Sequence, residues 1–84
     1  MARRTEPQEG LGAALRELRL ERGLSQEEVA HRASLHPTWI SHLESARENP
    51  AWGTVRRLAT ALEVPLAVLA KRAEAIEAAG PRSV

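Results

Sequence analysis

The sequence predicts an all-α fold, in which five helices form one compact domain. Three observations lead to this prediction. Apolar residues recur at the i, i+3, i+4 and i+7 spacing of amphipathic helices. Glycine or proline separates each helical segment from the next. Residues 24–44 have the pattern of two short helices joined by a tight turn, and we expect the other segments to hold this pair in place.

Composition excludes several classes of protein. The 84 residues suffice for one small domain, and the absence of cysteine rules out a disulfide framework and a thiolate metal site. The histidines, His31, His36 and His42, never stand three or four residues apart, so we expect neither a metal nor a cofactor. No apolar run reaches the length of a membrane span and no signal peptide is recognisable, which predicts a soluble, cytoplasmic protein.

The chain divides into three parts. Residues 1–9 are polar and carry Arg3 and Arg4, so we interpret them as a flexible basic arm, with a solvated tail as the alternative. Residues 10–80 contain all five predicted helices and form the domain. Residues 81–84 form a short tail.

The first two helices have clear start and stop signals. The first is expected over residues 11–22, followed by Gly23 as a C-terminal stop. The second is expected over residues 25–33, because Ser25 followed three residues later by Glu28 is a capping box. The residues predicted to face inward are Leu11, Leu15, Leu18, Val29, Ala30 and Ala33.

The third helix is expected over residues 37–45 and starts with Pro37, whose missing N–H is harmless there. At 100° per residue, Ile40 and Leu43 point inward with Glu44 beside them. The opposite half of the helix carries short polar side chains and no aliphatic ones: Thr38, Ser41, His42 and Ser45. Such a surface can read the major groove of DNA, although an ordinary solvated helix face has a similar pattern.

The fourth helix is expected over residues 51–63. Its buried stripe consists of Val55, Leu58, Ala59 and Leu62. We interpret Trp52 as core packing and Asn49 as the residue that caps this helix.

The fifth helix is expected over residues 65–79 and is longer than a small core requires. One face carries Leu66, Leu69, Ala73 and Ile76. We expect Leu69, Ala73 and Ile76 to contact a second copy of the chain; the alternative is that this face folds back on the first helix.

The motifs LSQEEVA, SLHPTWISHLE and RENPAWGTVRRLATALEVPLAVL follow one another in the order and spacing of a known family. From about Leu15 to Leu69 the chain resembles the phage-repressor-like helix-turn-helix family, also called the xenobiotic response element type. The resemblance implies a compact, lambda-repressor-like domain of five helices with an extended last helix. It also implies binding to duplex DNA, usually as a homodimer on an inverted repeat.

The resemblance assigns roles to individual residues. The residues that would lie over base edges are Pro37, Thr38, Ser41 and His42. The residues that would contact phosphate are Ser25, Gln26 and Arg47. In the family an arginine of the first helix, here Arg19, often pairs with the glutamate that matches Glu44.

The pairing of Arg19 with Glu44 also makes sense from the residues themselves. Glu44 lies near the inward face of its helix, and a buried carboxylate needs a partner. The planar guanidinium of Arg19 can bind a carboxylate through two hydrogen bonds at once. We therefore predict a salt bridge that joins the first helix to the third; the alternative is two separately solvated charges.

Four positions depart from the family pattern. Ser34 and Ala46 stand where glycine is common, and Ala51 stands where a serine or similar cap is usual. His42 stands where arginine, glutamine or lysine is often found, so the resemblance does not determine which base it prefers.

These observations predict a sequence-specific transcriptional regulator that binds double-stranded DNA as a homodimer on an inverted-repeat operator, with Arg3 and Arg4 as further phosphate contacts. Two related alternatives are a DNA-binding antitoxin with a toxin partner and a controller of a restriction–modification system. A third is a protein-interaction domain that does not bind DNA, which the net charge of +1 favours. We do not expect an enzyme, because no positioned acid or oxyanion site accompanies the serine and histidine of the third helix.

Overall fold

The computed structural model describes residues 8–80, which form five α-helices and confirm the predicted all-α class. The arginines of the predicted arm, Arg3 and Arg4, and the tail residues 81–84 lie outside the described residues. The helices are α1 (Glu9–Glu21), α2 (Gln26–Ala33), α3 (Pro37–Glu44), α4 (Trp52–Leu62) and α5 (Leu66–Ala78).

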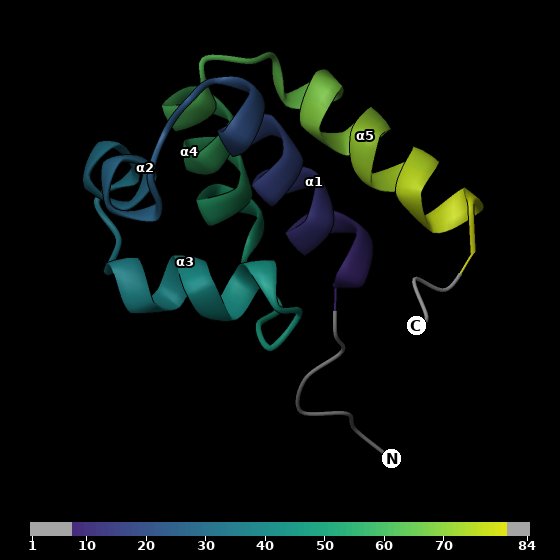
Figure 1. Cartoon of the computed structure of the whole chain (residues 1–84), viewed down its shortest axis with the longest axis horizontal. Coiled ribbons are helices and arrows are strands. Elements are labelled where there is room, and N and C mark those ends of the chain that lie inside the picture. The colour runs from purple at the N-terminus through teal and green to yellow at the C-terminus, as the bar shows by residue number, and fades with distance from the viewer. Residues whose placement is uncertain (1–7, 81–84) are drawn as a thin grey trace.

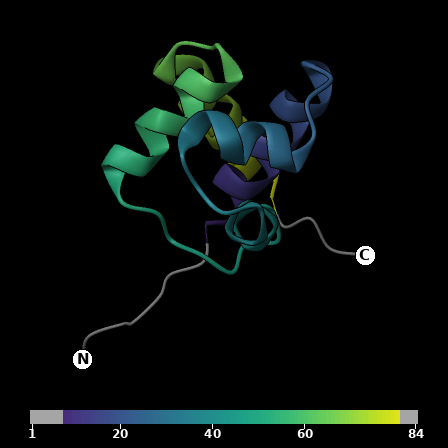
Figure 2. The same ribbon diagram turned by 90° about the vertical axis from the view of Figure 1, so that its left-hand side faces the viewer.

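The helices pack around α1, which lies in the middle of the molecule (Figure 1). α5 runs beside α1 on one side, whereas α2, α3 and α4 surround the other (Figure 1). Seen from the α2 side, α3 is viewed end-on beneath α2, at one edge of the molecule (Figure 2). The largest fully buried side chains come from all five helices: Leu15, Val29, Ile40, Leu43, Leu58, Leu62 and Leu69.

Two glycines allow α1 to approach its neighbours closely. α1 begins at Glu9, two residues before the predicted start, so Gly10 and Gly12 are both helical. A Cβ atom at Gly12 would clash with the backbone carbonyl of Leu43 in α3. A Cβ atom at Gly10 would lie 2.7 Å from the carbonyl oxygen of Ala73 in α5. The two glycines therefore set the distances of α3 and α5 from α1.

This packing predicts opposite effects for two glycine-to-alanine changes. Gly12→Ala is expected to lower the free energy of unfolding by about 1 to 3 kcal/mol, because backbone must move to admit the methyl group. Gly53→Ala is expected to raise it by up to about 1 kcal/mol, because Gly53 is helical and its Cβ would meet nothing within 4 Å. Urea denaturation followed by circular dichroism measures both, and equal effects would contradict the close α1–α3 contact.

The contact of α5 corrects one prediction. Leu69 is 0% exposed and Ile76 is 8% exposed, because both pack into the core of their own chain. Ala73 is half-buried beside Gly10. The prediction that Leu69 and Ile76 contact a second copy was wrong, because their own chain covers them, and the alternative, packing on the first helix, is what the structure shows. Contact of Ala73 with a second copy stays a prediction. Periodicity had located the apolar face correctly but not its partner.

Ion pairs also join α5 to α1. Arg72 donates hydrogen bonds to Glu17 at 3.1 Å and to Glu21 at 2.8 Å. The hydrogen bond and the charge of Arg72 lower the pKa of the Glu21 carboxyl. Because the pKa is lower in the folded chain than in the unfolded one, this contribution to stability is present at neutral pH. It is lost as the pH falls through the lowered pKa.

Two predictions about the start of α4 were wrong. Trp52 is 64% exposed rather than buried, because it stands in the first turn, on the flank of the apolar stripe and one turn before the half-buried Val55. Asn49 does not cap the helix, because α4 begins after Ala51 and has no side-chain cap. The rest of the predicted stripe, Leu58, Ala59 and Leu62, is buried as expected.

Three of the helices are followed by a residue other than glycine that has left-handed backbone geometry. Ser34, Ala46 and Glu63 have φ values of 59°, 63° and 60° and follow α2, α3 and α4. In each case the next residue donates its N–H to the carbonyl five positions back, as Leu35 does to Ala30 at 2.8 Å. This geometry explains why glycine is common in the family at the positions of Ser34 and Ala46.

Glycine at these helix ends is therefore expected to stabilise the domain. Ser34→Gly and Ala46→Gly should each raise the free energy of unfolding by about 0.5 to 1 kcal/mol, because glycine adopts positive φ without a steric penalty. As a control, Ala75→Gly, at an exposed position inside α5, should lower it by about 1 kcal/mol. Thermal unfolding of the three variants gives the comparison, and destabilisation by all three would contradict the assigned geometry.

Candidate nucleic-acid interface

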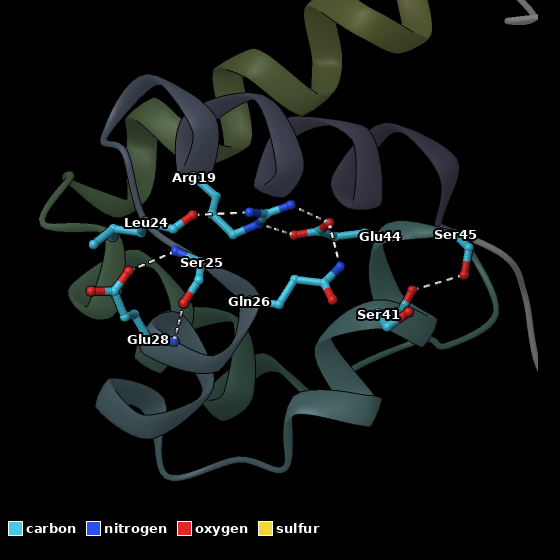
Figure 3. A network of polar contacts seen from close by, with 8 residues as sticks. All are labelled: Arg19, Leu24, Ser25, Gln26, Glu28, Ser41, Glu44 and Ser45. Carbon is cyan, nitrogen blue, oxygen red and sulfur yellow. Dashed lines mark hydrogen bonds and ion pairs between the residues drawn. The ribbon is translucent and has the colours of Figure 1, made fainter.

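A buried salt bridge fixes α3 against the rest of the domain. The Nε atom of Arg19 lies 2.7 Å from Oε2 of Glu44, and its Nη2 atom lies 3.0 Å from Oε1 (Figure 3). The two side chains are only 8% and 4% exposed. The predicted salt bridge between the first and third helices is therefore present, with the expected two-pronged geometry.

Two further groups complete this network. Nη1 of Arg19 donates to the carbonyl oxygen of Leu24 at 2.9 Å, which ties the start of α2 to α1 (Figure 3). The amide nitrogen of Gln26 donates to Oε1 of Glu44 at 3.0 Å. One carboxylate of α3 thus accepts hydrogen bonds from both α1 and α2, and no buried side-chain nitrogen or oxygen atom among residues 8–80 lacks a partner.

The outer face of α3 carries the side chains predicted to read bases. Ile40 and Leu43 are fully buried, which turns the opposite side of the helix outward. Thr38 is exposed there, and the remaining predicted residues are half-buried: Pro37, Ser41 and His42. The hydroxyl group of Ser45 donates to the carbonyl of Ser41 at 2.8 Å and so lies along the helix (Figure 3).

A histidine caps the start of α3, which the sequence analysis missed. The Nδ1 atom of His36 accepts the backbone N–H of Thr38 at 3.1 Å. The ring of His36 therefore satisfies an N–H group that would otherwise be open to a ligand. Histidine is not among the usual capping residues, and only its position directly before Pro37 indicated this role.

An acidic side chain beside His42 was also missed. Nδ1 of His42 lies 3.7 Å from Oε2 of Glu48, and both side chains are about one-third exposed. The carboxylate repels any phosphate group that approaches this end of α3. The spacing of six residues across a helix end gave no signal of this contact.

The residues predicted to contact phosphate lie at the ends of α2 and α3. The Ser25 hydroxyl accepts the Glu28 N–H at 3.0 Å and the Ser25 N–H donates to Glu28 at 2.7 Å, which confirms the capping box (Figure 3). The hydrogen bonds from Ser25 lower the pKa of the Glu28 carboxyl. Gln26 follows directly, and Arg47 is exposed immediately after α3.

Among residues 8–80, no group of three or more histidine, cysteine or acidic residues is arranged to hold a metal ion. Within the same range, no helix combines the length and hydropathy needed to cross a lipid bilayer.

Comparison with known proteins decides the family. The profile of a family described as "Helix-turn-helix domain" matches residues 10–73, which is most of the chain. The chain belongs to this helix-turn-helix family. The turn between α2 and α3 is the one that gives the family its name, and the domain is a DNA-binding transcriptional regulator rather than an enzyme.

Individual relatives of this helix-turn-helix domain are regulators. It is 43% identical over 54 residues to the HTH-type transcriptional regulator y4dJ of Sinorhizobium fredii, covering 64% of this chain and 70% of that protein. The clp gene regulator ClgR of Corynebacterium glutamicum is 31% identical, with a TM-score of 0.79 over 86% of this chain and 80% of that one. The restriction-modification controller protein C.AhdI of Aeromonas hydrophila is 34% identical, with a TM-score of 0.72 over 74% of this chain and 94% of that one. These matches confirm the lambda-repressor-like fold.

Proposed function

We propose that this helix-turn-helix domain recognises a specific double-stranded DNA sequence through the outer face of α3. The observation that supports this proposal is the buried network of Arg19, Gln26 and Glu44, which holds α3 rigidly by its inner side. A helix fixed in this way can present its outer side chains to base edges in the major groove. Those side chains are Pro37, Thr38, Ser41 and His42.

The phosphate contacts of this proposal come from the ends of α2 and α3. Ser25 and Gln26 lie at the start of α2, where backbone N–H groups and the helix dipole favour an anion. Arg47 adds a positive charge just beyond α3. These contacts would position the domain on the DNA backbone, whereas α3 would select the sequence.

Selection from random duplex DNA tests the proposal directly. The purified chain is incubated with a randomised duplex pool, and the bound fraction is amplified and sequenced over several rounds. Sequence-specific binding predicts one enriched motif, and a homodimer predicts an inverted repeat whose half-sites are about 34 Å apart. A pool that stays random after several rounds would overturn the proposal and favour the protein-interaction alternative.

We propose that the homodimer contact centres on Trp52, beside the surface first predicted, since Leu69 and Ala73 of α5 also line the adjoining hollow. Trp52 is 64% exposed beside an apolar hollow of about 320 Å³ between α1, α4 and α5. Apolar residues that line this hollow include Leu11, Pro50, Val55 and Leu66. An exposed tryptophan next to an apolar concavity is typical of a protein interface, and a second copy of this chain supplies the same aromatic group in return.

This placement predicts a loss of dimerisation in one variant. Trp52→Ala is expected to raise the dimer dissociation constant by about 30-fold or more, because truncation of an anchoring tryptophan typically costs about 2 kcal/mol. The matched control is Leu20→Ala, which removes an apolar side chain that is 54% exposed on α1 outside the hollow. Sedimentation equilibrium measures both constants, and an unchanged constant for the Trp52 variant would remove this surface from consideration.

A controller of a restriction–modification system is a second candidate, which the similarity to C.AhdI along 94% of that chain favours. Genes for a restriction endonuclease and a methyltransferase beside this one would support it. The antitoxin alternative predicts instead a neighbouring gene whose product is toxic when this chain is absent. Both alternatives also predict an enriched motif in the selection, so gene neighbourhood distinguishes them.

A further inference from the structure

A hollow rich in arginine lies between α2 and α4. Its volume is about 390 Å³, and the residues that line it are Arg32, Gly53, Arg56, Arg57 and Thr60. None of the residues proposed to contact bases or phosphates on the α3 side lines it, and no carboxylate does. It is therefore a separate, positively charged surface of the domain.

The sequence of α4 brings these residues together. Gly53, Arg56, Arg57 and Thr60 follow the i, i+3, i+4 and i+7 spacing, so they share one face of the helix. This face lies opposite the buried stripe of Leu58, Ala59 and Leu62. Gly53 carries no side chain, which leaves its part of the face open.

Arg32 reaches this face from α2. Its Nη1 atom donates to the carbonyl oxygen of Ala61 at 3.1 Å and lies 3.5 Å from Oε2 of Glu63, whose side chain is 71% exposed. The pKa of the Glu28 carboxyl, one turn earlier in α2, is lowered mainly by its hydrogen bonds with Ser25 and additionally by the charge of Arg32. The guanidinium of Arg32 is thus held at the edge of the hollow, and its side chain remains 41% exposed.

The other two arginines have no compensating charge. Neither Arg56 nor Arg57 forms an ion pair or a side-chain hydrogen bond to any residue between 8 and 80 through its guanidinium. The whole chain has a net charge of only +1, so two unpaired guanidinium groups beside a third that pairs with Glu63 are a pronounced local excess. Neighbouring like charges repel one another, and a multivalent anion would remove this repulsion.

We propose that this hollow is a phosphate-binding site for a ligand with several phosphate groups. Guanidinium groups bind phosphate oxygens through paired, charge-assisted hydrogen bonds, and three of them match a multivalent anion. The phosphates come either from a free polyphosphate compound or from the backbone of DNA that flanks the operator. The second source rests on the proposed function, whereas the first does not.

Calorimetry with inorganic tripolyphosphate tests the site without DNA. The double variant R56Q/R57Q is expected to weaken binding of tripolyphosphate to the full chain at least tenfold. The matched control, R16Q, changes an exposed arginine of α1 outside the hollow and is expected to bind as the wild type does. Circular dichroism and melting temperature verify that each variant is folded. If hexaglutamate binds as tightly as tripolyphosphate, the assignment to phosphate is overturned.

A DNA-binding experiment tests whether the phosphates come from DNA that flanks the operator. The salt dependence of binding is measured on the selected site alone and on the same site with ten additional base pairs on each side. If flanking phosphates occupy the hollow, R56Q/R57Q lowers the salt slope by about 2 on the longer duplex only, because each lost phosphate contact contributes about 0.9. Weaker binding of tripolyphosphate by R56Q/R57Q supports the site and identifies a free polyphosphate as its source. A lower salt slope on the longer duplex supports the site and identifies flanking DNA. If R56Q/R57Q behaves as the wild type in both arms, the site is overturned. A chain that binds no DNA contradicts the proposed function alone, because the tripolyphosphate arm still decides the site.

Discussion

Replacing Glu44 with alanine is expected to lower the free energy of unfolding by about 3 to 5 kcal/mol. The change leaves the Arg19 guanidinium, which is 8% exposed, without its buried counter-charge, and it also removes the acceptor of Gln26. For a domain of this size, a loss of this magnitude corresponds to a fall in melting temperature of about 12 °C or more. Thermal unfolding followed by circular dichroism is the measurement.

Three companion variants keep this prediction testable. Glu44→Gln retains an oxygen acceptor and is expected to lose less stability, so it stays folded if Glu44→Ala does not. Arg72→Ala removes the exposed ion pairs of α5 and is expected to cost no more than about 1 kcal/mol. Exchange of Arg19 and Glu44 together for methionine and leucine should restore most of the stability, because the cost comes from an unpaired buried charge. A wild-type melting temperature for Glu44→Ala would refute the structural role of the salt bridge.

Replacing His42 with alanine is expected to reduce the ratio of specific to random DNA binding by about 5- to 150-fold, the range of one lost base contact of about 1 to 3 kcal/mol. Arg47→Ala is expected to act differently. It should weaken binding to both kinds of DNA equally and lower the salt slope by about 0.9, because Arg47 is assigned to phosphate. Fluorescence anisotropy at several salt concentrations separates the two effects.

The control for the histidine variant is His31→Ala, because His31 is exposed on α2 and has no role in the proposed interface. It is expected to bind both kinds of DNA as the wild type does. Equal losses on specific and random DNA in the His42 variant would count against base reading. In that case the proposed assignment of α3 would need other side chains, with Thr38 and Ser41 the next to test.

Much of the fold followed from short-range features of the sequence. The stripe that contains Leu15 and Leu18, the capping box at Ser25 and Pro37 at the start of α3 each depend on residues within one or two turns, and the structure contains all of them. The inward position of Glu44 also followed from helix geometry. An inward carboxylate then required a cation, and the family resemblance pointed to Arg19, 25 residues away in the sequence.

The errors concern contacts between segments. The apolar face of α5 was located correctly, but the sequence does not state whether α1 or a second chain covers it. Gly10 has no side chain, so α5 can pack closely against α1 at this point. The periodicity of apolar residues does not reveal such a close approach between two helices. Trp52 was placed in the core for a similar reason, because an aromatic residue on the flank of a stripe is buried only if a neighbour reaches it. The contacts of His36 and Glu48 lie at the two ends of α3. The side-chain positions there depend on the geometry of the adjoining turn and not on helical periodicity.

The sharing of one carboxylate by three helices constrains how this regulator can evolve. Arg19 and Gln26 both donate hydrogen bonds to Glu44, so a lineage that replaces Glu44 or Arg19 alone passes through an intermediate with an unpaired polar group in its interior. Homologues are therefore expected to change Arg19 and Glu44 jointly or not at all. New operator preferences would then arise through Thr38, Ser41 and His42, whose replacement leaves the seating of the helix intact.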